Sequence, residues 1–224
     1  MNLNLADYQL KSTSRKFEDI EWTISYIFNR NDAKAPRYLV VGDSICNGYH
    51  NVLRNKLGDT ANLTFWASSY CVTDPAYLPL LENVLNGPRI DLIIFNNGLH
   101  SLVSDKIEWK QAYSLVIKYI QAKMPGVPLV LLNSTPLRDR DTRVNEVNKL
   151  TAEIAKEAGL PMIDFFSFCN EFDCALWSDN YHFFPEAIEK QAEFLAEKIR
   201  PLLPETNGNI SQAATATGPS GALK

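Results

Sequence analysis

The sequence predicts a single α/β domain built as a three-layer α/β/α sandwich with a parallel sheet. Uninterrupted apolar runs such as residues 90–96 alternate with stretches in which apolar residues recur at helical spacing. Strands that are apolar on both sides belong to parallel sheets, whose two faces are covered by crossover helices. The length of 224 residues, 46% of them hydrophobic, suits one domain. We place this domain at residues 1–203.

An extra helix is predicted near the N-terminus, because Phe17, Ile20, Ile24, Ile27 and Phe28 would share one helical face. We expect this helix to pack against the domain. After it, strands and helices alternate. Strands are predicted at residues 37–42, 62–66, 90–96, 127–133 and 161–166. Helices are predicted at about residues 45–57, 75–85, 106–123, 144–158 and 185–200.

Two helix boundaries follow from backbone chemistry. Gly159 accepts the left-handed conformation of a C-cap, and Pro161 prevents the helix from continuing. Pro185 suits the first position of the last helix, because its missing N–H would have no helical partner there. From residue 204 to 224 the chain is rich in Gly, Ala, Ser and Thr with little to bury, so we predict a disordered tail.

The charge balance excludes several classes of partner. With 22 basic and 26 acidic residues the net charge is −4, so no overall positive field would attract nucleic acid or an anionic membrane. The sequence has neither a membrane-spanning apolar run nor the pattern of a signal peptide, and we expect a cytoplasmic protein. A small neutral or weakly charged substrate fits this composition.

The four cysteines indicate neither a disulfide framework nor a zinc site. Cys46, Cys71, Cys169 and Cys174 have no paired CxxC spacing and no neighbouring histidines. We therefore expect free thiols and no metal. A thiolate nucleophile at Cys46 or Cys71 is a rival hypothesis, disfavoured because no histidine stands beside either in sequence.

Ser44, in the segment YLVVGDSICNGYH, is either a nucleophile or a helix cap. Asp43 or Ser44 would cap the helix that follows by accepting a backbone N–H bond. The phosphate-binding and dinucleotide-binding loops are excluded because the required lysine and glycines are missing. The nucleophile elbow of α/β-hydrolases is also excluded, because Cys46 stands where that motif needs its second glycine.

A serine nucleophile needs a base, and the chain has three histidines. His50 lies six residues beyond Ser44 and is predicted on the helix surface. His100 follows the strand at 90–96 and is predicted beside the ligand-binding edge of the sheet. His182 stands three residues after Asp179, which can hold one ring nitrogen while the other faces Ser44.

Together these segments resemble the SGNH/GDSL hydrolases, a serine esterase family with a flavodoxin-like sandwich. The resemblance covers roughly residues 37–200: VVGDSI looks like the first block and SDNYHFFPEA like the last. It implies a catalytic triad of Ser44, Asp179 and His182, with no cofactor. FNNGLHS stands where many members have G-x-N-D, and resembles a branch with an Asn-Gly turn that includes esterases acting on acetylated carbohydrate.

The resemblance also implies an oxyanion hole. The Ser44 N–H and one amide side chain are the expected donors. Neighbouring side chains of a strand point to opposite sides, so only one of Asn96 and Asn97 is expected to face the site. The branch pattern favours Asn96. Asn97 also suits a turn before Gly98. In SSYCVTDPAYL the usual block-two glycine is missing, and Ser69 is the expected backbone donor.

The predicted activity is hydrolysis of a short-chain, acetyl ester, with a carbohydrate as the favoured alcohol. Tyr70, His100 and Tyr181 are the expected substrate-binding residues, because aromatic faces with polar tips suit a sugar ring. Further aromatic residues, Trp66, Trp177, Phe183 and Phe184, surround the predicted loops. The alternatives are an acyltransferase, a thioesterase or a lysophospholipase of the same family, or a non-catalytic binding domain.

Overall fold

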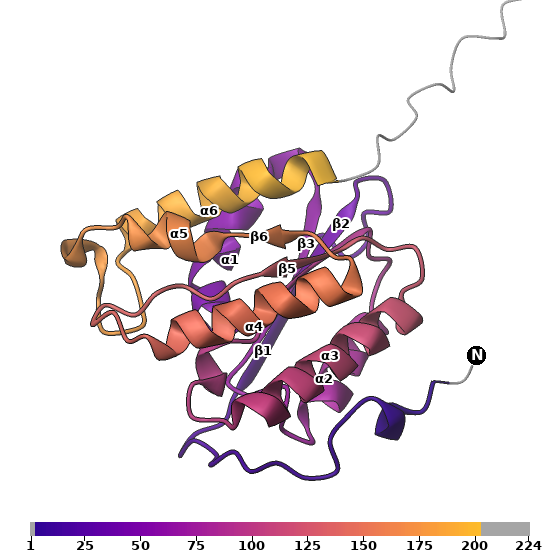
Figure 1. Cartoon of the computed structure of the whole chain (residues 1–224). Coiled ribbons are helices and arrows are strands. Elements are labelled where there is room, and N and C mark those ends of the chain that lie inside the picture. Colours follow the sequence, from indigo (N-terminus) through magenta and orange to yellow (C-terminus); the bar gives the residue numbers. More distant parts are fainter. Residues whose placement is uncertain (1–2, 203–224) are drawn as a thin grey trace, which may run out of the picture.

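A six-stranded sheet in the order β1-β3-β2-β4-β5-β6 forms the middle layer of the protein (Figure 1). The computed structural model describes residues 3–202. The strands are Thr23–Ile27 (β1), Arg37–Gly42 (β2), Asn62–Ser68 (β3), Leu92–Phe95 (β4), Leu129–Leu132 (β5) and Met162–Ile163 (β6). Every neighbouring pair is parallel except β1 with β3, which is antiparallel.

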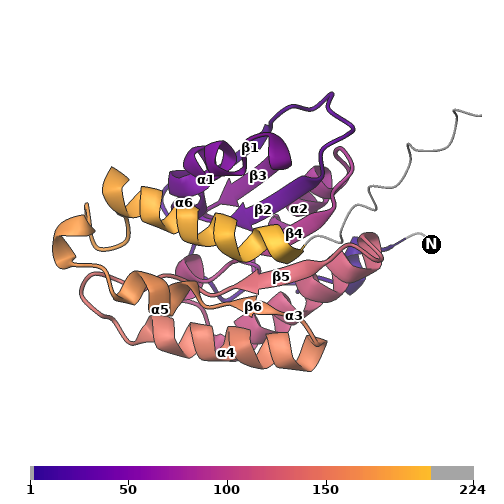
Figure 2. The same cartoon turned by 90° about the horizontal axis from the view of Figure 1, so that it is seen from above.

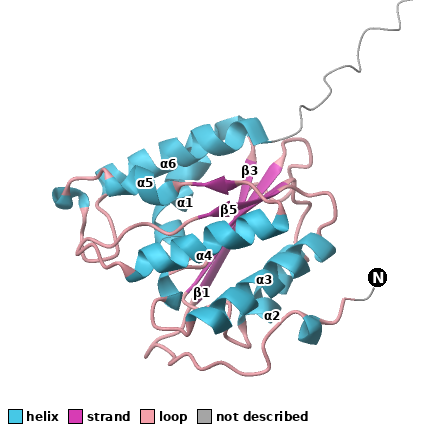
Figure 3. Ribbon diagram, viewed as in Figure 1, coloured by secondary structure: helices cyan, strands magenta, loops and turns pink. Residues whose placement is uncertain are grey.

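Helices cover both faces of this sheet, which confirms the predicted α/β/α sandwich (Figures 2 and 3). The α-helices are Ser44–Leu57 (α1), Tyr77–Leu85 (α2), Lys106–Lys123 (α3), Arg143–Ala158 (α4), Phe165–Asn170 (α5) and Pro185–Ile199 (α6). Short 3-10 helices are Leu5–Asp7, Gly58–Thr60, Leu99–Ser101, Cys174–Leu176 and Arg200–Leu202. Helices α1 and α6 pack on one face, and α2, α3 and α4 on the other. Right-handed crossovers require this placement of α1 to α4 for the observed strand order, whereas α6 follows the last strand and packs against α1.

The predicted N-terminal helix is wrong. Residues 17–20 form no regular structure, and Phe17 and Ile20 are 53% and 75% exposed. Thr23–Ile27 instead pairs with the free edge of β3, in register with Ser68 to Thr64. The β-branched residues in this segment suit an extended backbone, and pairing satisfies the β3 edge, which local helical periodicity does not reveal.

Two smaller predictions also need correction. The strand expected at 161–166 stops at Ile163, because the Asp164 side chain accepts the Ser167 N–H at 3.0 Å and caps α5. His50 does not lie on the surface of α1: it is buried, and its ring stacks on Phe65 with centroids 3.9 Å apart. Burial lowers the pKa of His50.

Other boundaries agree with the sequence. Gly159 caps α4 with φ +64°, and Pro185 is the first residue of α6. The tail predicted from residue 204 lies outside the described residues. Within residues 3–202, no helix is both long enough and apolar enough to cross a membrane.

The strand order places two loops side by side at one edge of the sheet. The chain leaves β2 toward β3 and leaves β4 toward β5, which opens a crevice at the carboxyl ends of β2 and β4. Ser44 follows β2, and Asn96 and Asn97 follow β4. At Gly42 an added Cβ would lie 2.5 Å from the Cys46 Cβ, so only glycine lets α1 start this close to β2.

Candidate active site

Ser44 is the first residue of α1, and its neighbour provides the helix cap. The Asp43 side chain accepts the Ile45 N–H at 3.0 Å. The Ser44 hydroxyl therefore has no capping role, and its backbone N–H lies at the positive end of the helix dipole. The residue is positioned to attack an electrophile and to stabilise negative charge.

His182 joins Ser44 to Asp179. Its Nε2 lies 2.8 Å from the Ser44 Oγ, and its Nδ1 lies 2.8 Å from an Asp179 carboxylate oxygen. Because a carboxylate only accepts hydrogen bonds, Nδ1 carries the hydrogen and Nε2 presents its lone pair to the hydroxyl. The arrangement is that of a serine–histidine–aspartate triad.

Asp179 is held in its charged form. Partial burial raises the pKa of its carboxyl, but hydrogen bonds from the His182 N–H, the His182 ring and the Tyr181 N–H outweigh burial and leave this pKa below its ordinary value. The two backbone bonds measure 2.8 and 2.7 Å. Asp179 is therefore an anion at neutral pH and favours the imidazolium that forms on proton transfer.

The loop that carries Asp179 and His182 is fastened on two sides. The Asn180 side chain accepts the Asp139 N–H and donates to the Asp139 carboxylate, each at 3.0 Å. On the other side, Trp177 packs against Phe183 with ring centroids 4.0 Å apart. These contacts fix the direction of the imidazole toward Ser44.

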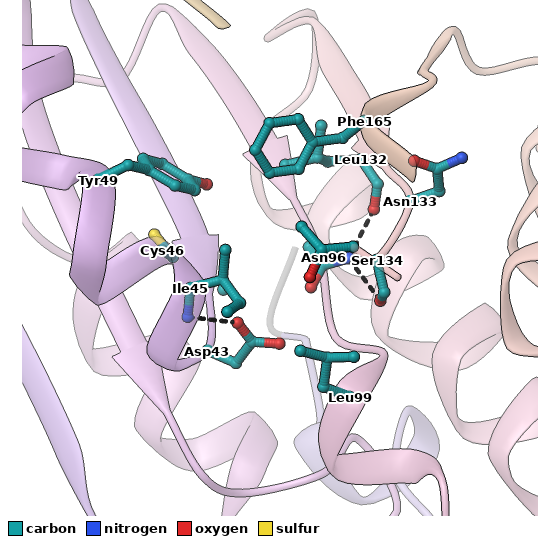
Figure 4. A pocket seen from close by; sticks show the side chains of 12 residues that line it. Asp43, Ile45, Cys46, Tyr49, Asn96, Leu99, Leu132, Asn133, Ser134 and Phe165 are labelled. Carbon is teal, nitrogen blue, oxygen red and sulfur yellow. Dashed lines mark hydrogen bonds between the residues drawn. The ribbon is translucent and has the colours of Figure 1, made fainter. Parts of the chain in front are cut away.

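Asn96 lies between the ends of β4 and β5. Figure 4 shows its amide donating to the Leu132 carbonyl at 2.7 Å and to the Ser134 hydroxyl at 3.2 Å. Asn96 lines a small pocket together with Asp43. The Ser134 contact is at the long end of the hydrogen-bond range.

Asn97 holds the loop after β3. Its carbonyl oxygen accepts the Val72 N–H at 3.0 Å, and its amide donates to the Tyr70 carbonyl at 2.9 Å. The side chain is only 1% exposed, whereas Asn96 is 8% exposed. This enclosure gives Asn97 a structural role in shaping the loop.

The prediction that Ser69 supplies a backbone donor is not supported, because its N–H donates to the Trp22 carbonyl at 3.1 Å. The next N–H groups are also engaged, with Tyr70 donating to the Ser68 hydroxyl and Cys71 to Asp74. With the Val72 N–H bound to Asn97, the whole 69–72 stretch offers no unengaged backbone donor.

A cleft of about 460 Å³ opens beside the Ser44–His182 pair. The residues that line it come from the N-terminal segment, the start of α1, the loop after β4, the start of α4 and the loop before α6: Glu18, Trp22, Ser44, Leu99, His100, Leu102, Val103, Arg143, Tyr181 and His182. His100 and Tyr181, two of the three residues expected to bind substrate, line this cleft. Tyr70 is not among the lining residues.

Half of the six aromatic residues expected around the site belong to the core. Trp66, Trp177 and Phe183 are buried, and the Trp66 indole donates to the Thr23 hydroxyl. Tyr181 and Phe184 are 41% and 48% exposed, and of these two Tyr181 lines the cleft. The sequence places these residues near the loops but cannot tell which side chains turn inward.

Sequence reasoning missed the contribution of the N-terminal segment, Glu18 and Trp22, because that segment was expected to be a helix. Arg143 was also missed. It is the first residue of α4, which follows β5. Its place beyond the carboxyl end of a strand could have marked it as a residue of the ligand-binding edge.

The cysteines do not form a competing site. Burial raises the pKa of the Cys46 and Cys71 thiols, so neither is a thiolate at neutral pH. All four cysteines are free. Within residues 3–202, no three His, Cys, Asp or Glu side chains are grouped to hold a metal ion.

Similar solved structures include GDSL-like lipases, acylhydrolases and an acetylxylan esterase, although no family model and no curated protein matches the sequence. A member of the lipolytic G-D-S-L family from Veillonella parvula shares 18% identity, with a TM-score of 0.62 over 75% of this chain and 100% of its own. A GDSL-like lipase from Bacteroides thetaiotaomicron shares 12%, with a TM-score of 0.60 over 75% and 89%.

An acetylxylan esterase from Geobacillus stearothermophilus, crystallised as a catalytic mutant, shares 14% identity with this chain. Its TM-score is 0.58 over 74% of this chain and 93% of the esterase. The alignments cover 89–100% of these three relatives. The chain thus has the fold of the SGNH/GDSL hydrolases.

Proposed function

We propose that this protein is a serine esterase that hydrolyses short-chain, acetyl esters of carbohydrates. The observation that carries the proposal is His182, which contacts the Ser44 hydroxyl with one ring nitrogen and the Asp179 carboxylate with the other. Ser44 and the distant loop that carries Asp179 and His182 bring three side chains together in the order that nucleophilic acyl transfer requires.

The reaction proceeds through an acyl-enzyme. His182 Nε2 takes the Ser44 proton as Oγ bonds to the ester carbonyl carbon, and Asp179 stabilises the imidazolium. His182 then gives this proton to the alcohol oxygen as the ester C–O bond breaks. A water molecule, deprotonated by His182, attacks the acyl carbon; the acid leaves and Ser44 regains its proton.

Two donors stabilise the negative oxygen of the tetrahedral intermediate. The Ser44 N–H at the start of α1 is one, and we assign the Asn96 amide as the second because Asn97 is enclosed by the loop it holds. The long Asn96–Ser134 contact is the one that the oxyanion would replace. Catalytic hydrogen bonds commonly tighten only when substrate is bound.

The cleft supports a small acyl group and a polar alcohol. Leu99 and Leu102 provide apolar surface beside Ser44, while His100 and Tyr181 provide polar groups and an aromatic face. The structural similarity to the Geobacillus acetylxylan esterase favours acetylated carbohydrate among such esters.

The decisive experiment compares Ser44→Ala with Cys46→Ala in hydrolysis of p-nitrophenyl acetate. Loss of the nucleophile should lower kcat by several orders of magnitude, whereas Cys46→Ala should keep turnover because that thiol is buried and protonated. A fluorophosphonate adduct mapped to Ser44 by mass spectrometry completes the test. Wild-type turnover in Ser44→Ala would refute the serine mechanism.

The substrate is tested separately by chain length and by sugar. Rates should fall from p-nitrophenyl acetate to butyrate to octanoate, and acetate should be released from acetylated xylo-oligosaccharides. A preference for octanoate, or no acetate from any acetylated sugar while Ser44 remains reactive, would reject the carbohydrate substrate and retain the esterase.

A further inference from the structure

A second carboxylate–imidazole pair lies in the same cleft as Ser44 and His182. The His100 Nδ1 is 2.6 Å from a Glu18 carboxylate oxygen, and both residues line the cleft. Trp22 meets the His100 ring edge-to-face, with centroids 6.4 Å apart. Residues 82 positions apart in sequence thus form one wall of the cleft.

This pair presents unused hydrogen-bond acceptors. A carboxylate cannot donate, so the His100 Nδ1 carries the hydrogen and Nε2 has a free lone pair. Among residues 3–202, no group forms a hydrogen bond with the His100 Nε2 or the Glu18 Oε2. Neither atom belongs to the buried polar atoms that lack a partner, so both reach the surface of the protein. Both acceptors are therefore open to a ligand in the cleft.

A buried arginine holds the Glu18 segment in place. The Arg15 guanidinium, with a fully buried side chain, contacts the Asp74 carboxylate at 2.6 Å and the Glu21 carboxylate at 3.0 Å. It also donates to the Ser69 carbonyl at 3.2 Å. Glu18 lies at the edge of this cluster, 3.4 Å from Arg15, so its carboxylate is positioned by the core while half-exposed to the cleft.

We propose that Glu18 and His100 form a subsite that binds hydroxyl groups on the alcohol part of the ester. Two acceptors side by side suit two hydroxyl hydrogens of a polyol, and the carboxylate disfavours anionic alcohols. This inference rests on the proposed esterase function. It adds that the cleft selects esters whose alcohol part carries free hydroxyl groups. Glu18 and His100 are specificity-determining residues with no part in proton transfer to or from Ser44.

The test uses two esters with the same acetyl group and the same three-carbon alcohol skeleton. Glycerol monoacetate carries two free hydroxyls and propyl acetate carries none; acid release is followed by titration at constant pH. The wild type should prefer glycerol monoacetate, and Glu18→Gln should reduce the ratio of the two kcat/KM values about tenfold, the effect of losing a charged hydrogen bond. His100→Gln should reduce it similarly.

Glu108→Gln is the matched control. Glu108, on α3, binds the same N-terminal segment by accepting the Ser14 N–H at 3.0 Å, but it does not line the cleft. Its substitution should leave the ratio at the wild-type value. Equal loss on both esters in Glu18→Gln and His100→Gln, or a wild type without preference, would overturn the subsite. Turnover of propyl acetate by the wild type reports the proposed function separately.

Discussion

Asn97 accepts the Val72 N–H at 3.0 Å and so fastens the loop after β3 to the loop after β4. The adjacent Asn96 contacts β5 instead, through the Leu132 carbonyl. The two neighbouring asparagines therefore anchor different elements, and the role that we propose in oxyanion binding belongs to Asn96 alone.

Substitution of these two asparagines should affect different quantities. Asn97→Ala leaves the Val72 N–H and the Tyr70 carbonyl without partners and should lower the free energy of unfolding by about 1–3 kcal/mol. Asn96→Ala should lower kcat by about 10²–10³-fold, the usual effect of removing an oxyanion donor. Urea unfolding and p-nitrophenyl acetate kinetics measure the two. A larger loss of kcat in Asn97→Ala than in Asn96→Ala would assign the oxyanion contact to Asn97 instead of Asn96.

Asp179→Asn should lower kcat by about 10³–10⁴-fold with little change in KM, because the amide no longer fixes the tautomer of His182. Steady-state kinetics with p-nitrophenyl acetate measure both constants. Asp173→Asn, in the capping position before the Cys174–Leu176 turn, is a control with a similar charge change. A mutant that keeps wild-type kcat would exclude Asp179 from the mechanism.

The pH profile should show that Asp179 stays ionised on the acid side. Its folded pKa lies below the ordinary value of 3.8, so this carboxylate stays mainly ionised down to about that pH. Between neutral pH and about pH 5, protonation of Asp179 should therefore add no slope to the acid side of log kcat/KM, which should fall by no more than one logarithmic unit per pH unit. A two-proton slope in this range would show that Asp179 also titrates.

Gly98→Ala should destabilise the protein, since the new Cβ would lie 1.8 Å from the Ser134 Oγ and 3.0 Å from its Cβ. Ser134 is buried, so its displacement should cost about 1–3 kcal/mol. Gly48→Ala in the middle of α1 is the control: its Cβ meets only Ile188 at 3.8 Å, and the helix should gain about 0.5–1 kcal/mol. The midpoint temperature of thermal unfolding should be highest for Gly48→Ala, intermediate for the wild type and lowest for Gly98→Ala.

Alkylation should distinguish the cysteines. Cys174 is exposed, whereas Cys46, Cys71 and Cys169 are buried, and burial raises the pKa of each buried thiol. Under native conditions iodoacetamide should modify Cys174 and leave esterase activity intact, as peptide mass spectrometry and a parallel assay would show. Modification of Cys46 with loss of activity would revive the thiol mechanism.

The strands and helices from residue 37 onward could be predicted because their signals are local. The apolar run at Arg37–Gly42, the glycine that ends α4 and the proline that begins α6 each report their own conformation. The convergence of Ser44 and His182 could be anticipated from the resemblance and from the shared edge of the sheet.

The remaining features depend on contacts that no single segment contains. The segment Thr23–Ile27 is a strand because β3 has a free edge, and Ser69 is unavailable as a donor because Trp22 lies opposite it. Likewise, Glu18 enters the cleft because Arg15 ties it to Asp74. Pairing partners of this kind are set by tertiary structure, so periodicity and spacing could not supply them.

The separation of 138 positions between Ser44 and His182 also sets the order in which the two residues are made on the ribosome. At about 5–20 residues per second, the base emerges roughly ten seconds after the nucleophile. Throughout that interval a nascent chain carries a serine with no imidazole to deprotonate it. The triad that we propose is therefore complete only once the loop before α6 has been made, and a chain truncated before Asp179 should be inert toward esters.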